Sequence, residues 1–350
     1  MKTHLMLLAC LLLAACGGEA ASPTAVPTPI PTTTTPVTPA EPTETMAETA
    51  VFPPANGLLF MQIAPGSQTL ARFDLNSSEV ETLFIPLTNS WLSLADSNPD
   101  GSEFVLAYAP PPPDGEVQMG FTQLYLLTNG DTTPRLLIEP QQAGEIFFYP
   151  DWTADGRFIY YSHVVQQDNA PFTTTLERFD RESGESKVVA DNGIWGRVSP
   201  NGRLLAYVLV NLEALTRELV VSEADGSNPR TLVTQEDFAD MDAPFFSPDS
   251  QWLYFSAVPL PQSSWWDRLL GVEAAAAHAV PSDWWRIPVG GGSPEQISHI
   301  NEAGLYGGFA PDGTQIAFAS QTGLYTMNPD GSNLQKRLET SAGVMLTWIP

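Results

Sequence analysis

The sequence predicts an all-β protein in which residues 56–350 form a six-bladed β-propeller of four-stranded blades. Three observations predict this fold. A turn of the Pro-Asp-Gly type recurs along the chain, an apolar strand follows each copy, and the last residues match a turn that the first blade lacks. Such repeats are typical of propellers and solenoids.

The repeated turn has a clear structural role. It occurs in SNPDGSEFVLAYA (97–109), WTADGRFIYYS (152–162), VSPNGRLLAYV (198–208), FSPDSQWLYFS (246–256) and FAPDGTQIAFAS (309–320). The glycine or serine positions are 55, 46, 48 and 63 residues apart. Proline presets φ, aspartate bonds the local backbone, and glycine adopts the left-handed conformation that closes the turn. We therefore expect these aspartates to serve the turn rather than catalysis.

Each interval predicts the same strands in the same order. The strand after the turn covers 104–108, 158–161, 204–208, 252–255 and 316–318. The next strand covers 124–127, 176–179, 219–221, 284–289 and 324–327, and a third covers 135–138, 187–189, 230–233, 295–297 and 335–338. A fourth run leads into the following turn.

The two ends of the propeller are predicted to complete one blade together. Residues 57–62 and 69–85 supply three strands with no turn before them. The segment VMLTWIP (344–350) matches a strand that leads into the repeated turn and ends at its proline. Pairing these segments closes the ring and removes its open edges.

The N-terminal residues predict export and lipidation. Lys2 precedes a short apolar run, and Leu13-Ala14-Ala15-Cys16 resembles a bacterial lipobox. Residues 1–15 would then be a lipoprotein signal peptide, and Cys16 would carry lipid chains such as palmitate that anchor the protein to a membrane. The alternative is an ordinary secretory signal with a chance cysteine. Since Cys10 leaves with the signal, no disulfide is expected in the mature chain.

Residues 16–55 are predicted to be a disordered linker, because they are rich in Thr and Pro and offer little to bury. The domain would therefore stand away from the membrane, in the cell envelope and outside the cytoplasm. The chain has a net charge of −25, which disfavours nucleic acid and anionic lipid surfaces as partners. We expect a monomer.

The pattern of Pro-Asp-Gly turns, Leu-Ala-Tyr strands and Asp-Gly-Ser hairpins resembles the WD-repeat-like propeller of the TolB family. The resemblance covers 57–350 and implies a six-bladed fold. It implies little about function, since such propellers also occur in sugar-active enzymes and prolyl-oligopeptidase-type peptidases. The sequence leaves no room for a separate N-terminal domain, so a role in the Tol system is not expected.

Catalytic motifs are not found. The sequence has no G-x-S-x-G elbow, P-loop or dinucleotide fingerprint, and we expect no cofactor. The histidines that follow Cys16, His163, His278 and His299, are not in ligand spacing with one another, so a histidine-rich metal site is not expected. The protein is therefore more consistent with a binding module than with an enzyme.

The long insertions, at 109–121, 163–174 and 259–283, are all predicted on one face of the propeller. The last of them predicts a helix around 264–280 that opens with Trp265, Trp266, Asp267 and Arg268. The tryptophans could contact a partner, a sugar or a peptide. Alternatively, the helix folds back as a lid and buries them.

A second candidate site lies on the innermost strands. Asp96, Asp151 and Arg197 occupy matching positions in successive repeats, and Asp240 and Asp242 lie on the next such strand. They could converge near the central channel, as a structural network or as a site. Two functions follow: a lipoprotein that presents a non-enzymatic binding module for a protein, peptide or glycan, or a glycan-active enzyme that uses such carboxylates.

Overall fold

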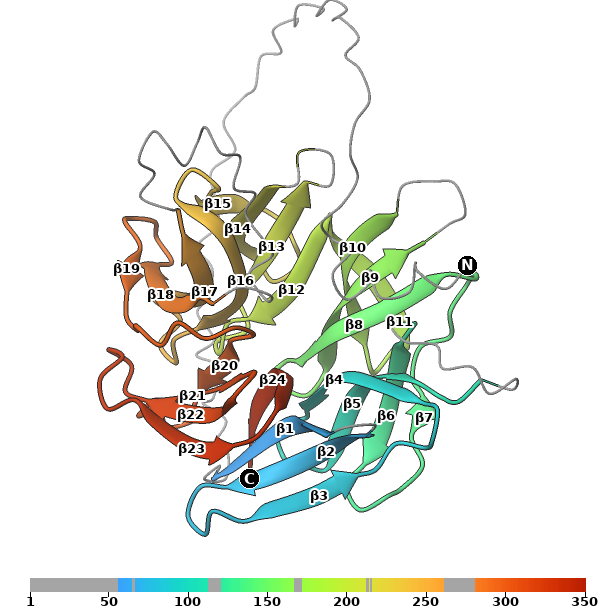
Figure 1. Cartoon of the computed structure of the whole chain (residues 1–350). Coiled ribbons are helices and arrows are strands. Elements are labelled where there is room, and N and C mark those ends of the chain that lie inside the picture. The colour runs from blue at the N-terminus through green and yellow to red at the C-terminus, as the bar shows by residue number, and fades with distance from the viewer. Residues whose placement is uncertain are drawn as a thin grey trace, which may run out of the picture. The chain divides into compact units, whose positions relative to one another are not determined.

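The structure, a computed structural model, describes residues 56–64, 67–112, 121–166, 172–211, 214, 216–260 and 281–350. These residues form six four-stranded antiparallel sheets, which confirms the predicted propeller (Figure 1). The described part contains no helix, and hence none that could span a membrane. The helix predicted around 264–280 lies outside the described residues.

The first three blades follow the predicted order of strands. Blade 1 contains β24 (Ala342–Ile349), β1 (Gly57–Ala64), β2 (Ser67–Asp74) and β3 (Val80–Phe84). Blade 2 contains β4 (Trp91–Ser97), β5 (Glu103–Ala109), β6 (Gln123–Thr128) and β7 (Arg135–Leu136). Blade 3 contains β8 (Glu145–Trp152), β9 (Phe158–Val165), β10 (Thr173–Asp180) and β11 (Glu185–Asp191).

The other three blades repeat the same arrangement. Blade 4 contains β12 (Gly193–Val198), β13 (Leu204–Asn211), β14 (Thr216–Glu223) and β15 (Arg230–Val233). Blade 5 contains β16 (Phe238–Phe246), β17 (Trp252–Pro259), β18 (Asp283–Pro288) and β19 (Glu295–Gln296). Blade 6 contains β20 (Tyr306–Phe309), β21 (Ile316–Ser320), β22 (Gly323–Met327) and β23 (Gln335–Glu339).

The innermost strands surround a common centre. Each of β24, β4, β8, β12, β16 and β20 contacts the innermost strands of the two neighbouring blades (Figure 1). The predicted closure is confirmed, because β24 pairs with β1 in an antiparallel register that places Gly57 opposite Ile349 and Leu58 opposite Trp348. The ring is therefore closed by hydrogen bonds between strands from the two ends of the propeller.

The repeated turns have the predicted chemistry. The residue at the glycine position has a positive φ in all five copies, between 59° and 74°, even where serine replaces glycine at Ser250. In the first copy, the Asp100 carboxylate accepts a hydrogen bond from the backbone N–H of Ser102, at 2.9 Å. Asp155, Asp249 and Asp312 accept the corresponding bond in their own turns. These aspartates are therefore structural residues.

The connections between strands differ sharply between the two ends of the propeller. We call the end with the repeated turns the turn face and the opposite end the loop face. On the turn face, the longest connection is the seven-residue hairpin 328–334, between β22 and β23. On the loop face, β5 and β6 are joined by residues 110–122, and β17 and β18 by residues 260–282. Two of the predicted insertions, 109–121 and 259–283, begin and end at strand ends on the loop face. The third, 163–174, is mostly strand, because β9 runs to Val165 and β10 begins at Thr173.

Apolar side chains fill the space between the blades. The largest are aromatic, and several are fully buried, including Trp284, Phe255 and Phe318. The Trp284 and Phe318 rings, from blades 5 and 6, lie 5.8 Å apart in an edge-to-face contact. This packing holds the innermost strands at fixed positions around the centre.

Candidate functional site

The candidate site is the ring of side chains on the innermost strands near the turn face. At one position of these strands, the six blades carry, in order, Thr347, Asp96, Asp151, Arg197, Phe245 and Gly308. The structure links the first four of these side chains in pairs: Thr347 donates a hydrogen bond to Asp96, and Arg197 donates one to Asp151. Each aspartate also accepts a backbone N–H of the next blade.

Asp96 connects three blades. One carboxylate oxygen accepts a hydrogen bond from the Thr347 hydroxyl of blade 1, at 2.5 Å. The other accepts the backbone N–H of Trp152 in blade 3, at 2.7 Å. Burial and the nearby Asp151 carboxylate raise the pKa of Asp96 to about 6. The carboxylate is thus held by its neighbours and is only 4% exposed.

Asp151 repeats this arrangement one blade further on. It accepts the backbone N–H of Val198 in blade 4, at 3.3 Å, and a 2.5 Å hydrogen bond from the Arg197 guanidinium. Burial raises the pKa of Asp151, although Arg197 opposes this effect. Arg197 in turn lies over the ring of Tyr306, 5.0 Å from its centre. Since Tyr306 belongs to blade 6, this contact joins two blades that are not neighbours.

A second charged cluster joins blades 4 and 5. One guanidinium nitrogen of Arg217, on β14, lies 2.8 and 3.0 Å from the two carboxylate oxygens of Asp240, on β16. The same guanidinium lies 5.3 Å from the centre of the Trp195 ring. Asp242 is fully buried nearby, opposite Ser256 in the pairing of β16 with β17. Burial and the Asp240 charge raise the pKa of Asp242 to about 8.

Backbone irregularities aim these side chains at the centre. Tyr149, Trp195 and Ala243 lie two residues before the ring position in blades 3, 4 and 5, and each has a positive φ, between 47° and 55°. The strand register shifts at each of these places. Such bulges turn the following side chains relative to the sheet. The Tyr149 and Trp195 rings lie 5.1 Å apart and pack blade 3 against blade 4.

The predicted site residues are thus divided between two clusters. Asp96, Asp151 and Arg197 belong to one cluster, and Asp240 and Asp242 belong to the other. Trp265, Trp266, Asp267, Arg268 and Cys16 lie outside the described residues. Sequence reasoning did not identify Arg217 or the contact of Tyr306 with Arg197. The signal for Arg217 was its place two residues before Leu219 and four before Val221, on the side of β14 that carries the apolar residues.

The chemistry open to these carboxylates is limited. All four are buried, between 0% and 6% exposed, and they are held by backbone N–H groups, hydroxyls or arginines. A general acid or base must be within reach of its substrate. Within the described residues, no group of three or more His, Cys, Asp or Glu side chains is arranged to hold a metal ion. The two clusters therefore act chiefly as links between blades.

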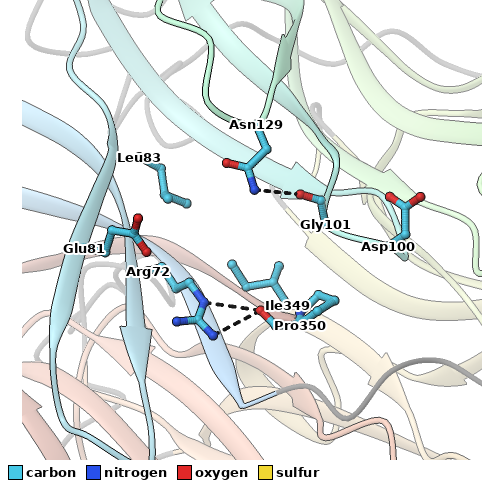
Figure 2. Close-up of a pocket in the computed structure, with 8 residues that line it drawn as sticks. All are labelled: Arg72, Glu81, Leu83, Asp100, Gly101, Asn129, Ile349 and Pro350. Atoms are coloured by element: carbon cyan, nitrogen blue, oxygen red, sulfur yellow. Dashed lines mark hydrogen bonds between the residues drawn. The ribbon is translucent and has the colours of Figure 1, made fainter.

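A small pocket of about 210 Å³ opens on the turn face between blades 1 and 2. Figure 2 shows the Arg72 guanidinium directed at the backbone oxygen of Pro350, which it meets at 3.1 and 3.3 Å, and Asn129 directed at Gly101. None of the predicted site residues lines this pocket. Both contacts lie within a blade, Arg72 with Pro350 in blade 1 and Asn129 with Gly101 in blade 2.

Comparisons with known proteins give the fold. No protein-family model matches the sequence, and no curated protein matches it. Among solved structures, TolB from Acinetobacter baumannii matches with a TM-score of 0.59 and 13% identity, over 84% of this chain and 67% of that one. A putative TolB from Agrobacterium tumefaciens matches with a TM-score of 0.57 and 16% identity, over 85% and 99%.

An enzyme has a similar propeller. An oligogalacturonate lyase, solved in complex with manganese, matches with a TM-score of 0.51 and 15% identity, over 80% of this chain and 73% of that one. At these identities the likeness shows the fold alone. The matches to the two TolB structures confirm the predicted resemblance to TolB propellers at the level of fold. The function must be argued from the site itself.

Proposed function

We propose that the protein is a lipid-anchored binding module that presents the loop face of its propeller to a partner protein outside the cytoplasm. The observation that carries this proposal is the contrast between the two faces. The turn face has only short hairpins, whereas the two longest connections, 110–122 and 260–282, begin and end at strand ends on the loop face. Loops that vary on a rigid scaffold are where binding residues concentrate.

Exposed large apolar side chains are more numerous on the loop face, although Val80 and Leu334, each 40% exposed, lie on the turn face. Among the described residues, the two most exposed are Ile85 and Leu87, 70% and 66% exposed, in the connection between β3 and β4 on the loop face. Ile63 and Leu260 are exposed at the same end of their strands. Apolar groups exposed near one another are typical of surfaces that bind other proteins.

The alternative function, a glycan-active enzyme, is less well supported. A glycosidase needs one carboxylic acid and one carboxylate beside an open substrate site. Asp96, Asp151, Asp240 and Asp242, the residues predicted for this role, are buried and bonded within the propeller. The pocket between blades 1 and 2 contains none of them. We therefore propose binding rather than catalysis.

Photo-crosslinking in the native host would test the proposed face. A photoreactive amino acid would replace Leu87 on the loop face or, as a matched control, Leu334, which is 40% exposed on the turn face. We expect a discrete adduct from position 87 and none from position 334. Equal crosslinking from both positions, or from 334 alone, would contradict the proposed binding face.

The proposed anchor needs a separate test, because Cys16 precedes the described residues. Metabolic labelling with a palmitate analogue should modify the wild-type protein and the Cys10→Ser variant, since Cys10 would be removed with the signal peptide. The Cys16→Ser variant should take up no label and should leave the membrane fraction. Label in the Cys16→Ser protein would contradict lipidation at Cys16.

A further inference from the structure

A cluster of one histidine and two glutamates lies at the loop-face end of blade 3, apart from both charged clusters of the centre. Glu145 is at the start of β8, His163 near the end of β9 and Glu177 on β10. Glu145, His163 and Glu177 have side chains that are 4%, 15% and 13% exposed. Sequence reasoning did not connect them, because they are distant along the chain and share no local motif.

The contacts of Glu177 fix the orientation of the imidazole. His163 Nδ1 lies 2.7 Å from Glu177 Oε1, and an ionised carboxylate only accepts hydrogen bonds, so Nδ1 carries the proton. The Thr175 hydroxyl donates to the same oxygen at 3.1 Å, and the Tyr161 hydroxyl donates to Oε2 at 2.6 Å. The Phe147 ring packs edge-on against the imidazole, at 4.7 Å. The ring is therefore held with Nε2 directed away from Glu177.

The other ring nitrogen faces the second carboxylate. Nε2 is buried and has no hydrogen-bond partner within the described part of the chain. It lies 3.7 Å from Glu145 Oε1, too far for a hydrogen bond. Glu145 Oε2 accepts the backbone N–H of Gln141 at 2.7 Å, so the other oxygen, Oε1, is the one that faces His163. A lone pair on Nε2 and a carboxylate oxygen thus face each other across a short gap.

The cluster carries more negative than positive charge, and this imbalance favours a cation in the gap. Two buried carboxylates surround one imidazole, and the only ion pairs that the described residues give to either carboxylate are those with His163. Burying negative charge without compensation is costly. In metal sites, a histidine ligand almost always donates its second ring N–H to a carboxylate or a carbonyl, as His163 donates to Glu177.

We propose that His163 Nε2 and Glu145 Oε1 bind a divalent transition-metal ion such as Zn²⁺, with water completing the coordination and Glu177 orienting the histidine. Zinc binds nitrogen and oxygen at about 2.0–2.2 Å, so tetrahedral ligands lie roughly 3.4 Å apart, close to the separation present. Nitrogen and carboxylate ligands together favour zinc over calcium or magnesium, which prefer oxygen alone. With two protein ligands, we expect binding weaker than in structural zinc sites.

Titration calorimetry with ZnCl₂ on the full-length protein, purified in detergent without a histidine tag and treated with a chelator, would test this site. We expect one saturable site in the wild type and none in His163→Gln or Glu145→Gln. Glu177→Gln should keep the site but weaken it by about 10–100-fold. The control His299→Gln changes an exposed histidine on blade 5 and should bind as the wild type does.

A direct signature would complement the titration. Co²⁺ in place of Zn²⁺ should give visible absorption that is lost in His163→Gln, and melting temperatures without metal would show that each variant folds. If a variant fails to fold, a shift of the His163 Nε2 NMR signal of the wild type on adding Zn²⁺ reports the bond. No binding by the wild type, or unchanged binding in folded His163→Gln, would overturn the proposal. In that case the gap holds a proton only.

Discussion

Blades 1 to 4 and blades 5 and 6 fill the same position of the propeller with different chemistry. Around the centre, the first four blades carry Thr347, Asp96, Asp151 and Arg197, whereas the last two carry Phe245 and Gly308. In the first group, carboxylates accept backbone N–H groups of the next blade. In the second, the Phe245 ring contacts Phe309 of the next blade, 5.8 Å away. One architecture thus accepts polar or apolar links between its blades.

The contacts between blades should therefore differ between the two groups in how their stability responds to pH and to substitution. Polar links depend on ionisation and on the presence of both partners, because an unpaired buried charge is costly. Aromatic contacts depend only on shape and buried area. Arg217 and Asp240 join the two groups at the boundary between blades 4 and 5. Three substitutions test this contrast.

The largest effect is expected from Asp151→Ala. Removing this carboxylate leaves the Arg197 guanidinium, which is mostly buried, without its ion-pair partner and leaves the Val198 N–H unpaired. Breaking a buried pair typically costs about 3–5 kcal/mol of unfolding free energy. Urea denaturation would measure the loss. The double variant Asp151→Leu with Arg197→Met should lose less than the sum of the single variants, and strict additivity would contradict the pairing.

A smaller effect, visible only as a function of pH, is expected from Asp242→Asn. The folded pKa of Asp242 is raised to about 8, above the unfolded value near 4. In between, the unfolded chain releases a proton that the folded chain keeps, so stability falls as pH rises through this window. The variant lacks this titration. The unfolding free energy of the variant minus that of the wild type should therefore be larger at pH 9 than at pH 5, by at least about 2 kcal/mol.

Thermal and chemical unfolding at both pH values would measure this difference between variant and wild type. The matched control is Asp155→Asn on the turn face, an exposed turn residue that should leave the difference near zero. An equal pH response in the wild type and in Asp242→Asn would show that Asp242 is already ionised in the folded protein.

The smallest effect is expected from Phe245→Leu in the apolar group. The change removes part of the ring that stacks on Tyr254 at 5.3 Å and touches Phe309, and the smaller side chain stays apolar. We expect a loss of about 1 kcal/mol, with the same value at pH 5 and pH 9. A pH-dependent loss would mean that the aromatic contacts are coupled to the charged network, and the contrast between the two groups would fail.

The fold could be predicted from local patterns because its turns are local. NPDGS occurs at 98–102 between β4 and β5 and at 328–332 between β22 and β23, two different places in a blade. Both copies make the same bonds, including a 2.6 Å hydrogen bond from the serine hydroxyl to the aspartate. A five-residue segment therefore determines its own turn wherever it lies, and the strand count follows.

The partners of the central charges could not be predicted in the same way. Their positions followed from the repeat, but the contact of Arg197 with Tyr306 joins two blades that are not neighbours. It also depends on bulges at Tyr149 and Trp195, residues that rarely adopt a positive φ and gave no local signal. The cluster of Glu145, His163 and Glu177 was not predicted for a related reason, because its residues lie on three separate strands.

The pairing of β24 with β1 also sets the order in which the protein can be made. The innermost strand of blade 1, residues 342–349, is synthesised long after its neighbour at 57–64. At about 5–20 residues per second, β1 waits roughly 15–60 seconds for this partner. Until then the sheet keeps an open edge on the inner side of β1. A chain built this way cannot close its ring before residues 342–349 are made, and the open edge stays available to chaperones for that time.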